Sequence, residues 1–386
     1  MSSPKSVPRL EIDTVLDTAR IIVCCGSGGV GKTTTAAALA LRAAERGRSV
    51  VVLTIDPARR LAQSMGLTEL DNTPRAVKGV DEAEGGHLDA MMLDMKRTFD
   101  EIVVAHSTPE RADKILENPF YQSLSSSFSG TQEYMAMEKL GQLKDDGQWE
   151  LVVVDTPPTR SALDFLDAPQ SLARFLDGRL LRLLVAPAKA GGRAYMKVLS
   201  AGFLTFARIF TKIIGAQTLQ DVSQFVAALE TMFGGFRQRA EETYRLLAAP
   251  GTAFVVVSAP EPAALREASY FVDRLAADKM PLAGLVLNRV TRSKAPELPA
   301  ERALAAAEEL EGSDSDPLAA SVLRVHAERV AMATRQRKLA ERFTRAHPEV
   351  PQAEITALAG DVHDLKGLRA VGAELAEGSL ALRDAG

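Results

Sequence analysis

The chain has 386 residues, of which 46% are hydrophobic and 25% are charged, a composition typical of folded globular proteins that excludes wholesale disorder. Its 46 basic and 50 acidic residues give a formal net charge of −4, which argues against nucleic acid as the main partner because nucleic acid requires a clustered positive field. The N-terminal segment lacks the apolar core of a signal peptide, and no run of about 18 uncharged apolar residues predicts a membrane span.

The two cysteines, Cys24 and Cys25, are adjacent in the sequence. Neighbouring cysteines rarely pair, so the sequence predicts neither a disulfide framework nor the thiolates of a zinc quartet. This cysteine usage fits a reducing compartment, and we expect a cytoplasmic protein.

The first informative element in chain order is a short apolar run at 21–25, typical of a buried parallel strand. A glycine-rich loop follows, and then an Ala- and Leu-rich helix expected at 34–46. The loop matches G-x-x-x-x-G-K-[ST] in the strand–loop–helix context that phosphate binding requires. The residues expected to bind the nucleotide here are Gly26, Ser27, Gly28, Gly29, Val30, Gly31, Lys32, Thr33 and Thr34.

The residue types of this loop explain why it is expected to bind phosphate. Glycines let the backbone curl so that successive N–H groups point at phosphate oxygens, and the N-terminus of the helix adds positive dipole character. Lys32 is expected to hold the β- and γ-phosphates of ATP, and the Thr33 hydroxyl to ligate Mg²⁺. The alternative is a glycine-rich turn with an exposed lysine, which the agreement of motif and context disfavours.

Two carboxylates come directly after apolar strands. Asp56 follows a strand expected at 49–55, and Asp155 follows one at 151–154. In a doubly wound sheet ligands bind at the carboxyl edge of the strands, where both residues would lie. Asp155 is interpreted as an acid that holds Mg²⁺ through water, and Asp56 as a catalytic residue that orients the attacking water. The alternative for each is a helix N-cap.

Together these segments resemble the ArsA and tail-anchored-protein-targeting (Get-type) ATPases, including their bacterial "anion-transporting ATPase" branch, within the larger group of MinD, ParA and nitrogenase iron protein. The resemblance covers most of the chain and rests on the phosphate loop, on D-P-A at 56–58 and on D-T-P-P-T at 155–159. It implies a single α/β P-loop domain over 1–386, with a doubly wound, mainly parallel sheet. It also implies a helical subdomain inserted at about 90–145 and 175–250.

The resemblance assigns roles to two later residues. Glu261 follows a strand expected at 253–257 and matches a glutamate that reaches the nucleotide across the family's dimer. Asn288 ends another strand, within V-L-N-R, and matches the asparagine that binds adenine.

The main departure from the family pattern is Ser27, because the family normally has a lysine there that crosses the dimer to the partner's nucleotide. A serine side chain is too short and carries no charge, so it cannot replace that lysine. One interpretation is that another cation substitutes, with Arg59, Arg60 and Arg160 as candidates. The other is a heterodimer with a paralogous ATPase that keeps the lysine.

Two further departures concern metal and anion binding. The chain lacks the C-x-x-C that clamps a dimer through zinc in the eukaryotic targeting factors, so no zinc is expected. Arsenite binding needs converging thiolates, whereas Cys24 and Cys25 would point to opposite faces of one strand. A role as an arsenite or anion pump subunit is therefore disfavoured.

Helices are expected at 196–215 and 218–247, and the second carries an apolar stripe. Packing into a core is the favoured interpretation of this stripe, with a hydrophobic client groove as the alternative. Met91 and Met92 are expected in a helix, as core or groove-wall residues.

The sequence therefore predicts an ATPase that uses ATP and Mg²⁺. Its cycle would move the helical subdomain to handle a protein or membrane-complex client, as a homodimer or a heterodimer. The competing class is a nucleotide-binding scaffold or regulatory subunit with little turnover. The presence of Lys32, Thr33, Asp56 and Asp155 disfavours an inactive site, whereas Ser27 keeps that alternative open.

Overall fold

The computed structural model divides the chain into two compact units: 1–92 with 146–163 and 247–386, and 93–145 with 164–246. The residues that it describes are 7–56, 60–105, 107–119, 121–122, 125, 131–157, 238–239, 241–312 and 316–377. The helix expected at 196–215 and most of the one at 218–247 lie outside the described residues.

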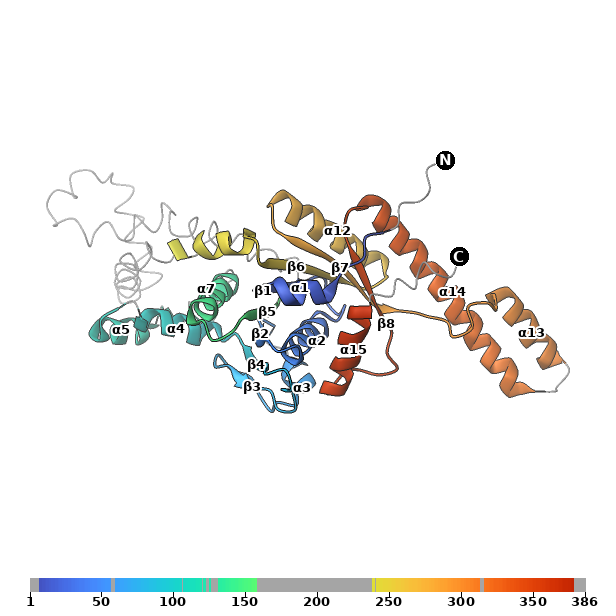
Figure 1. The fold of residues 1–386 in the computed structure, drawn as a ribbon, viewed down its shortest axis with the longest axis horizontal. Helices are drawn as coiled ribbons and strands as arrows, with labels where there is room; N and C mark the ends of the chain where they lie inside the picture. The colour runs from blue at the N-terminus through green and yellow to red at the C-terminus, as the bar shows by residue number, and fades with distance from the viewer. Residues whose placement is uncertain are drawn as a thin grey trace, which may run out of the picture. The chain divides into compact units, whose positions relative to one another are not determined.

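An eight-stranded sheet forms the first unit, in the order β3-β4-β2-β5-β1-β6-β7-β8 (Figure 1). All neighbouring strands run parallel except β3 and β4, which pair antiparallel. The strands are β1 (Ile21–Cys25), β2 (Ser49–Thr54), β3 (Arg75–Ala76), β4 (His87–Met92), β5 (Leu151–Asp155), β6 (Thr252–Ser258), β7 (Leu282–Val290) and β8 (Gln352–Thr356). This architecture confirms the predicted α/β class with a mainly parallel sheet.

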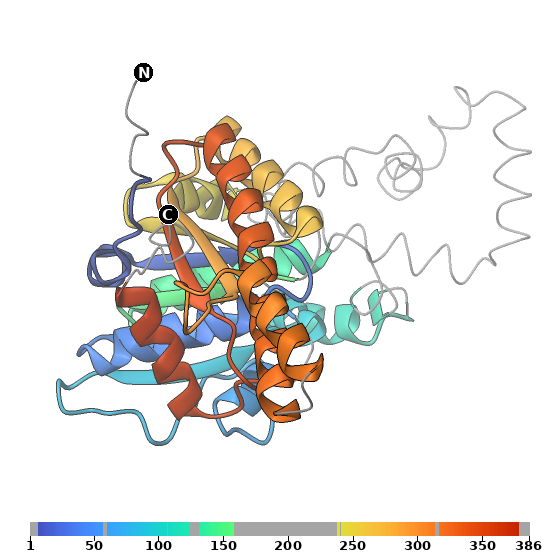
Figure 2. The ribbon, with the colours of Figure 1, turned by 90° about the vertical axis from the view of Figure 1, so that its right-hand side faces the viewer.

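Helices cover both faces of this sheet. The helices of this unit are α1 (Ile12–Thr18), α2 (Lys32–Glu45), α3 (Arg60–Ser64), α12 (Pro262–Ala277), α13 (Ala300–Gly312), α14 (Pro317–Ala346) and α15 (Leu365–Glu377). The connection from β1 to β2 runs toward one edge of the sheet, and that from β6 to β7 toward the other. Right-handed crossovers therefore place α2 and α12 on opposite faces. Figure 2 shows α15 beside α2, and α14 beside α12.

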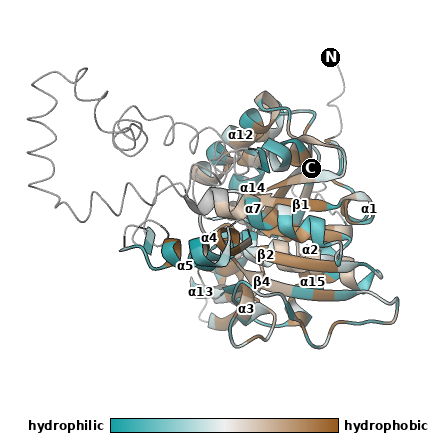
Figure 3. Ribbon diagram, turned by 90° about the vertical axis from the view of Figure 1, so that its left-hand side faces the viewer, coloured by the Kyte–Doolittle hydropathy of each residue, from teal (hydrophilic) through white to brown (hydrophobic). Residues whose placement is uncertain are grey.

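The core lies between these layers. Every residue of β1, β5 and β6 is buried, and all three strands are rich in β-branched or other apolar side chains, as expected for strands covered on both faces. Figure 3 shows the hydrophobic colour along the central strands. The inner face of α2 is built from alanines and leucines, which lets the helix lie close to the sheet. Helix α15 packs on α2 with Gly372, beside Ala38 and Arg42.

The second unit is helical in its described part. Its helices include α4 (Met95–Ala105), α5 (Pro109–Leu116) and α7 (Thr131–Asp146). Phe99 of α4 stacks on Tyr121, with 5.3 Å between ring centroids, and the Tyr121 hydroxyl donates a hydrogen bond to Asp100. Lys139 of α7 pairs with Glu101 at 3.1 Å.

One expectation about secondary structure is wrong. Met91 and Met92 belong to β4, not to a helix. They pair in register with Leu53 and Thr54 of β2, so the neighbouring strand supplies hydrogen bonds that the local sequence does not reveal. Tertiary pairing therefore overrides the helix preference of methionine.

No helix among the described residues combines the length and the apolar character that crossing a bilayer requires.

We predict that Gly284→Ala destabilises the first unit. Gly284 lies in β7, and a Cβ there would sit 2.5 Å from the Pro351 carbonyl oxygen and 3.1 Å from Leu10 Cδ1. Relieving this overlap requires a backbone shift, so the free energy of unfolding should fall by about 1–3 kcal/mol, measured by urea denaturation followed by circular dichroism. Gly312→Ala is the control, because an added Cβ there meets no described heavy atom within 4 Å beyond its chain neighbours and its own helix. Equal midpoints for both variants would contradict this account.

Candidate nucleotide-binding site

The loop between β1 and α2 curls at the carboxyl edge of the sheet. Gly31 precedes the first residue of α2 in the left-handed region, at φ 94°, and its absent Cβ would lie 2.2 Å from the Asn288 amide nitrogen. Gly26, at φ 150°, passes so close to β6 that a Cβ would lie 2.0 Å from the Val257 carbonyl oxygen. Both positions therefore require glycine, one for backbone conformation and close approach, the other for close approach to a neighbouring strand.

Lys32 is folded back over this loop. Only 6% of the residue is exposed, and its Nζ donates a hydrogen bond to the Ser27 carbonyl oxygen at 2.9 Å. Burial lowers the pKa of Lys32, while the charges of Asp155 and Asp56 oppose that shift. The ammonium group thus stands at the loop with a backbone partner that a phosphate oxygen can replace.

Asp155 is the most deeply buried carboxylate of the site, with no exposed surface. Its Oδ2 accepts hydrogen bonds from the Thr33 hydroxyl at 2.7 Å and from the Thr54 hydroxyl at 2.9 Å. Burial raises the pKa of Asp155 to about 6, and these two hydrogen bonds together with Lys32 work against that rise. Its Oδ1 is buried and has no hydrogen-bond partner among the described residues.

The position of Asp155 Oδ1 suits an interaction with hydrated Mg²⁺. An unpaired buried carboxylate oxygen is costly unless a ligand or water completes its interactions. Thr33 and Asp155 supply the hard oxygen atoms that Mg²⁺ prefers, and the ion usually keeps several waters and binds substrate phosphates as well. Among the described residues no three His, Cys, Asp or Glu side chains converge as a metal site.

Asp56 is half-buried and lies just beyond the end of β2. Its backbone N–H donates to the Thr54 hydroxyl at 3.2 Å. β2 and β5 are neighbours and Thr54 is the register partner of Asp155, so Asp56 lies two residues beyond the residue that faces Asp155. Residues 57–58 of the D-P-A motif and 158–159 of the D-T-P-P-T motif lie outside the described residues, as do the candidate cations Arg59 and Arg160. Arg60 begins α3 and is exposed.

Asn288 is brought to the phosphate loop from β7, far away in the sequence. Its Nδ2 donates to the Val30 carbonyl oxygen at 2.8 Å, and its Oδ1 accepts the Arg289 N–H at 2.9 Å. Arg289 adopts φ 61°, an uncommon conformation for a residue with a side chain. Both polar atoms of the Asn288 amide are therefore hydrogen-bonded, and the bond to Val30 holds the amide against the loop.

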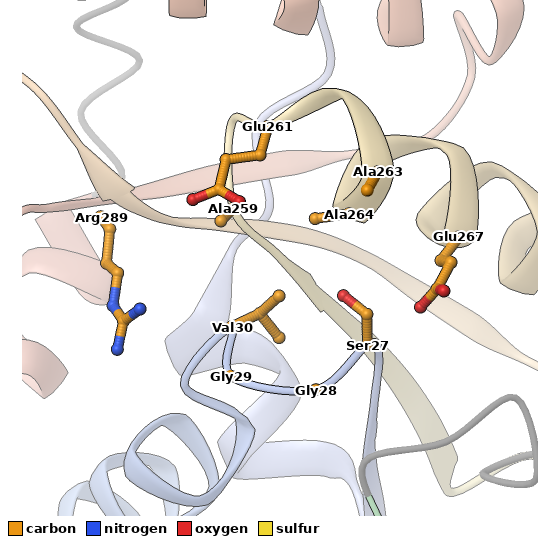
Figure 4. A pocket seen from close by; sticks show the side chains of 10 residues that line it. All are labelled: Ser27, Gly28, Gly29, Val30, Ala259, Glu261, Ala263, Ala264, Glu267 and Arg289. Carbon is orange, nitrogen blue, oxygen red and sulfur yellow. The ribbon is translucent and has the colours of Figure 1, made fainter.

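Glu261 stands at the N-cap of α12, but its side chain caps no backbone N–H of that helix. It lines a cavity of about 330 Å³ together with the outer side of the phosphate loop. Figure 4 shows Ser27 and Val30 on the loop side of this cavity, with Glu261 and Glu267 across from them. Arg289 lies at another part of the lining.

The two cysteines lie in the core of β1. Both are fully buried, and burial raises the pKa of both thiols, that of Cys25 to about 12. Neutral, buried thiols are poor ligands for a soft anion or metal. This geometry gives no support to an arsenite site.

The structure thus places Lys32, Thr33, Asp56 and Asp155 at one edge of the sheet, and Asn288 beside the loop. The roles of all these residues stay predictions. Sequence reasoning gave no role to Thr54, Glu267 or Arg289. Thr54 has a sequence signal, since it is a polar residue at the end of an apolar strand and two positions before Asp56. Glu267 has no such sequence signal, because it lies on α12, far along the chain from the loop.

Comparisons with known proteins show the family of the chain. Residues 19–311 match the family model described as "Anion-transporting ATPase". The chain is 32% identical to an ATPase GET3 of Malassezia globosa over 155 residues, 40% of this chain and 44% of that protein. It is 26% identical to ATPase ASNA1 homolog 2 of Paramecium tetraurelia over 267 residues, 69% of this chain and 74% of that protein. An ATPase GET3 of Podospora anserina is 25% identical over 289 residues, 72% and 76% of the two chains.

The first of these matches spans less than half of its relative, whereas the other two span about three quarters. The family model, however, covers most of this chain, including the phosphate loop, both carboxylates, Glu261 and Asn288. The chain belongs to the anion-transporting ATPase family of P-loop ATP hydrolases.

Proposed function

We propose that the chain binds ATP with Mg²⁺ at the loop 26–34, and that hydrolysis drives a conformational change through which the second unit handles a protein client. The observation that carries the proposal is the convergence of Lys32, Thr33 and the buried Asp155 at the N-terminus of α2. A helix N-terminus, an ammonium group and hard oxygen ligands suit a nucleotide polyphosphate with its metal ion.

Each residue has a distinct role in this proposal. Lys32 exchanges the Ser27 carbonyl for phosphate oxygens and stabilises the charge on the transferred group. Thr33, and Asp155 through water, would hold Mg²⁺, which neutralises phosphate charge when it is bound. Asp56 orients the attacking water. Glu261 and Asn288 would bind the nucleotide, the first from across a dimer and the second at the adenine.

The client and the assembly are the finer part of the proposal. Relatives carry the name ATPase GET3, which supports a protein client, and we propose that the second unit is the part that handles it. Order changes in segments that touch a γ-phosphate are a known means of moving such a subdomain. We propose a dimer, with a second copy or with a paralogous ATPase, as the working form.

Ser27 gives the second candidate function its support. Its side chain lines the cavity beside the loop, while its backbone carbonyl already satisfies Lys32. No ammonium group projects from position 27 toward a partner's nucleotide. A regulatory subunit that binds ATP but hydrolyses little would have such a site.

Lys32→Ala should abolish the activity. Its ammonium group is the cation that the loop holds at the phosphates, and its loss should lower the rate of phosphate release by about 100-fold or more. Steady-state assays of phosphate release test this, with Lys338→Ala on the exposed side of α14 as the control. Unchanged turnover in Lys32→Ala would exclude this loop as the hydrolytic site.

Asp56→Asn should separate binding from hydrolysis. The backbone N–H of Asp56 still donates to Thr54, so the local structure is retained while the carboxylate is lost. We expect kcat to fall about 100-fold or more, with the affinity for a fluorescent ATP analogue within about threefold of the wild type. Asp81→Asn, in an exposed loop, is the control. An equal loss of affinity and rate would mean that Asp56 shapes the pocket instead.

Ser27→Lys tests the role of the missing lysine. If a partner's lysine normally completes the site, this variant should hydrolyse ATP about 10-fold faster than the wild-type chain alone, because each copy of a homodimer then supplies the cation. Ser27→Met controls for side-chain length. A wild-type rate that Ser27→Lys does not raise would count against a lysine-bearing paralogue. ATP binding without turnover in both would favour the regulatory subunit.

A further inference from the structure

Thr54 is the last residue of β2 and is 1% exposed. The four residues before it, 50–53, are apolar and fully buried. A hydroxyl in this position must find partners inside the protein, since a buried polar group without a hydrogen bond costs free energy. The hydrogen-bond partners of this hydroxyl are Asp155 and Asp56, which belong to the candidate nucleotide-binding site.

The hydroxyl of Thr54 acts both as a hydrogen-bond donor and as a hydrogen-bond acceptor. It carries one proton and lies 2.9 Å from Asp155 Oδ2 and 3.4 Å from the Asp56 carbonyl oxygen. The shorter distance and the negative charge of the carboxylate direct the proton to Asp155. A lone pair on the same oxygen accepts the Asp56 N–H at 3.2 Å. One atom therefore connects the carboxylate at the end of β5 to the backbone at the end of β2.

A buried threonine with a purely structural role would have different hydrogen-bond partners from those of Thr54. Thr156, equally buried and one residue beyond Asp155, donates its hydroxyl to the backbone carbonyl of Cys24 at 2.8 Å. That bond satisfies the threonine without involving a carboxylate. Thr54 instead shares Asp155 Oδ2 with Thr33, and Oδ1 has no partner in the part of the chain that the structure describes.

We propose that Thr54 is a positioning residue for ATP hydrolysis in this chain. Two donors on Oδ2 fix the rotation of the Asp155 carboxylate and keep Oδ1 available for the hydration shell of Mg²⁺. The same hydroxyl fixes the start of the segment that carries Asp56. Thr54 thus holds the metal-binding acid and the water-orienting acid in one arrangement, without itself touching the nucleotide. The inference rests on the proposed function of the site.

Thr54→Val removes the hydroxyl and keeps the shape of the side chain, and Thr54→Ser keeps the hydroxyl. Loss of an outer partner of a metal site typically costs about 10- to 100-fold in metal affinity or activity. For Thr54→Val we expect kcat to fall about 10- to 100-fold, with KM for ATP at saturating Mg²⁺ within about threefold of the wild type. Thr54→Ser should recover most of the rate.

A second readout does not depend on turnover. Binding of a fluorescent ADP analogue is titrated with Mg²⁺, and the Mg²⁺ concentration for half-maximal effect should rise about 10-fold in Thr54→Val but not in Thr54→Ser. Thr252→Val is the matched control. Thr252 is a buried threonine at the start of β6, whereas the site lies at the carboxyl ends of the strands. Thermal melting identifies the folded variants. If Thr54→Val does not fold, Thr54→Ala takes its place, since it also lacks the hydroxyl and adds no bulk.

The outcomes separate the inference from the function beneath it. Wild-type protein without Mg²⁺-dependent nucleotide binding, or with turnover that survives Lys32→Ala, would overturn the proposed function. Wild-type protein that hydrolyses ATP, with a Thr54→Val variant that matches it in kcat and Mg²⁺ requirement, would overturn only the role of Thr54. A Thr54→Ser variant as impaired as Thr54→Val would also overturn it, because the methyl group and not the hydroxyl would then be the important part.

Discussion

The buried carboxylate of Asp155 is the group on which the arrangement of the site depends. It ends β5, between β2 and β1, and both neighbours end at the same edge of the sheet. A charge in this position is tolerated because two hydroxyls and the Lys32 ammonium stabilise it against the cost of burial. The register of three parallel strands therefore brings together the loop, the buried Asp155 and Thr54, which lies two residues before Asp56.

The topology of the sheet explains why the loop lies where it does. The chain leaves β1 toward one edge and β6 toward the other, so the helices after them lie on opposite faces and a crevice opens between the two strand ends. Gly26 lets the loop turn closely past β6, and Gly31 lets α2 begin beneath the Asn288 amide. The loop is thus shaped by β6 and β7 as well as by its own sequence, although these strands lie more than 200 residues further along the chain.

The parts of the site that depend on local sequence were predictable. The glycine loop, and acids directly after apolar strands, are read from a few consecutive residues, so Lys32, Thr33, Asp56 and Asp155 could be identified. The strand character of Met91 and Met92 could not, because it depends on pairing with β2. The bond from Thr54 to Asp155 depends in the same way on the β2–β5 register. Sequence reasoning could place Thr54 and Asp155 at strand ends, but it could not predict how the Asp155 carboxylate is rotated.

The substitution at position 27 separates two tasks that one residue normally combines. The proposed phosphate cradle would need only the backbone of this residue, and the Ser27 carbonyl accepts the Lys32 hydrogen bond with serine present. In the proposed dimer, a contact from position 27 to the partner's nucleotide would need a long cationic side chain, which serine lacks. A chain with serine can therefore keep its own nucleotide site while contributing nothing to that of its partner. In a pair of unlike chains this asymmetry would leave one of the two sites complete, and the complete site would be the one in this chain.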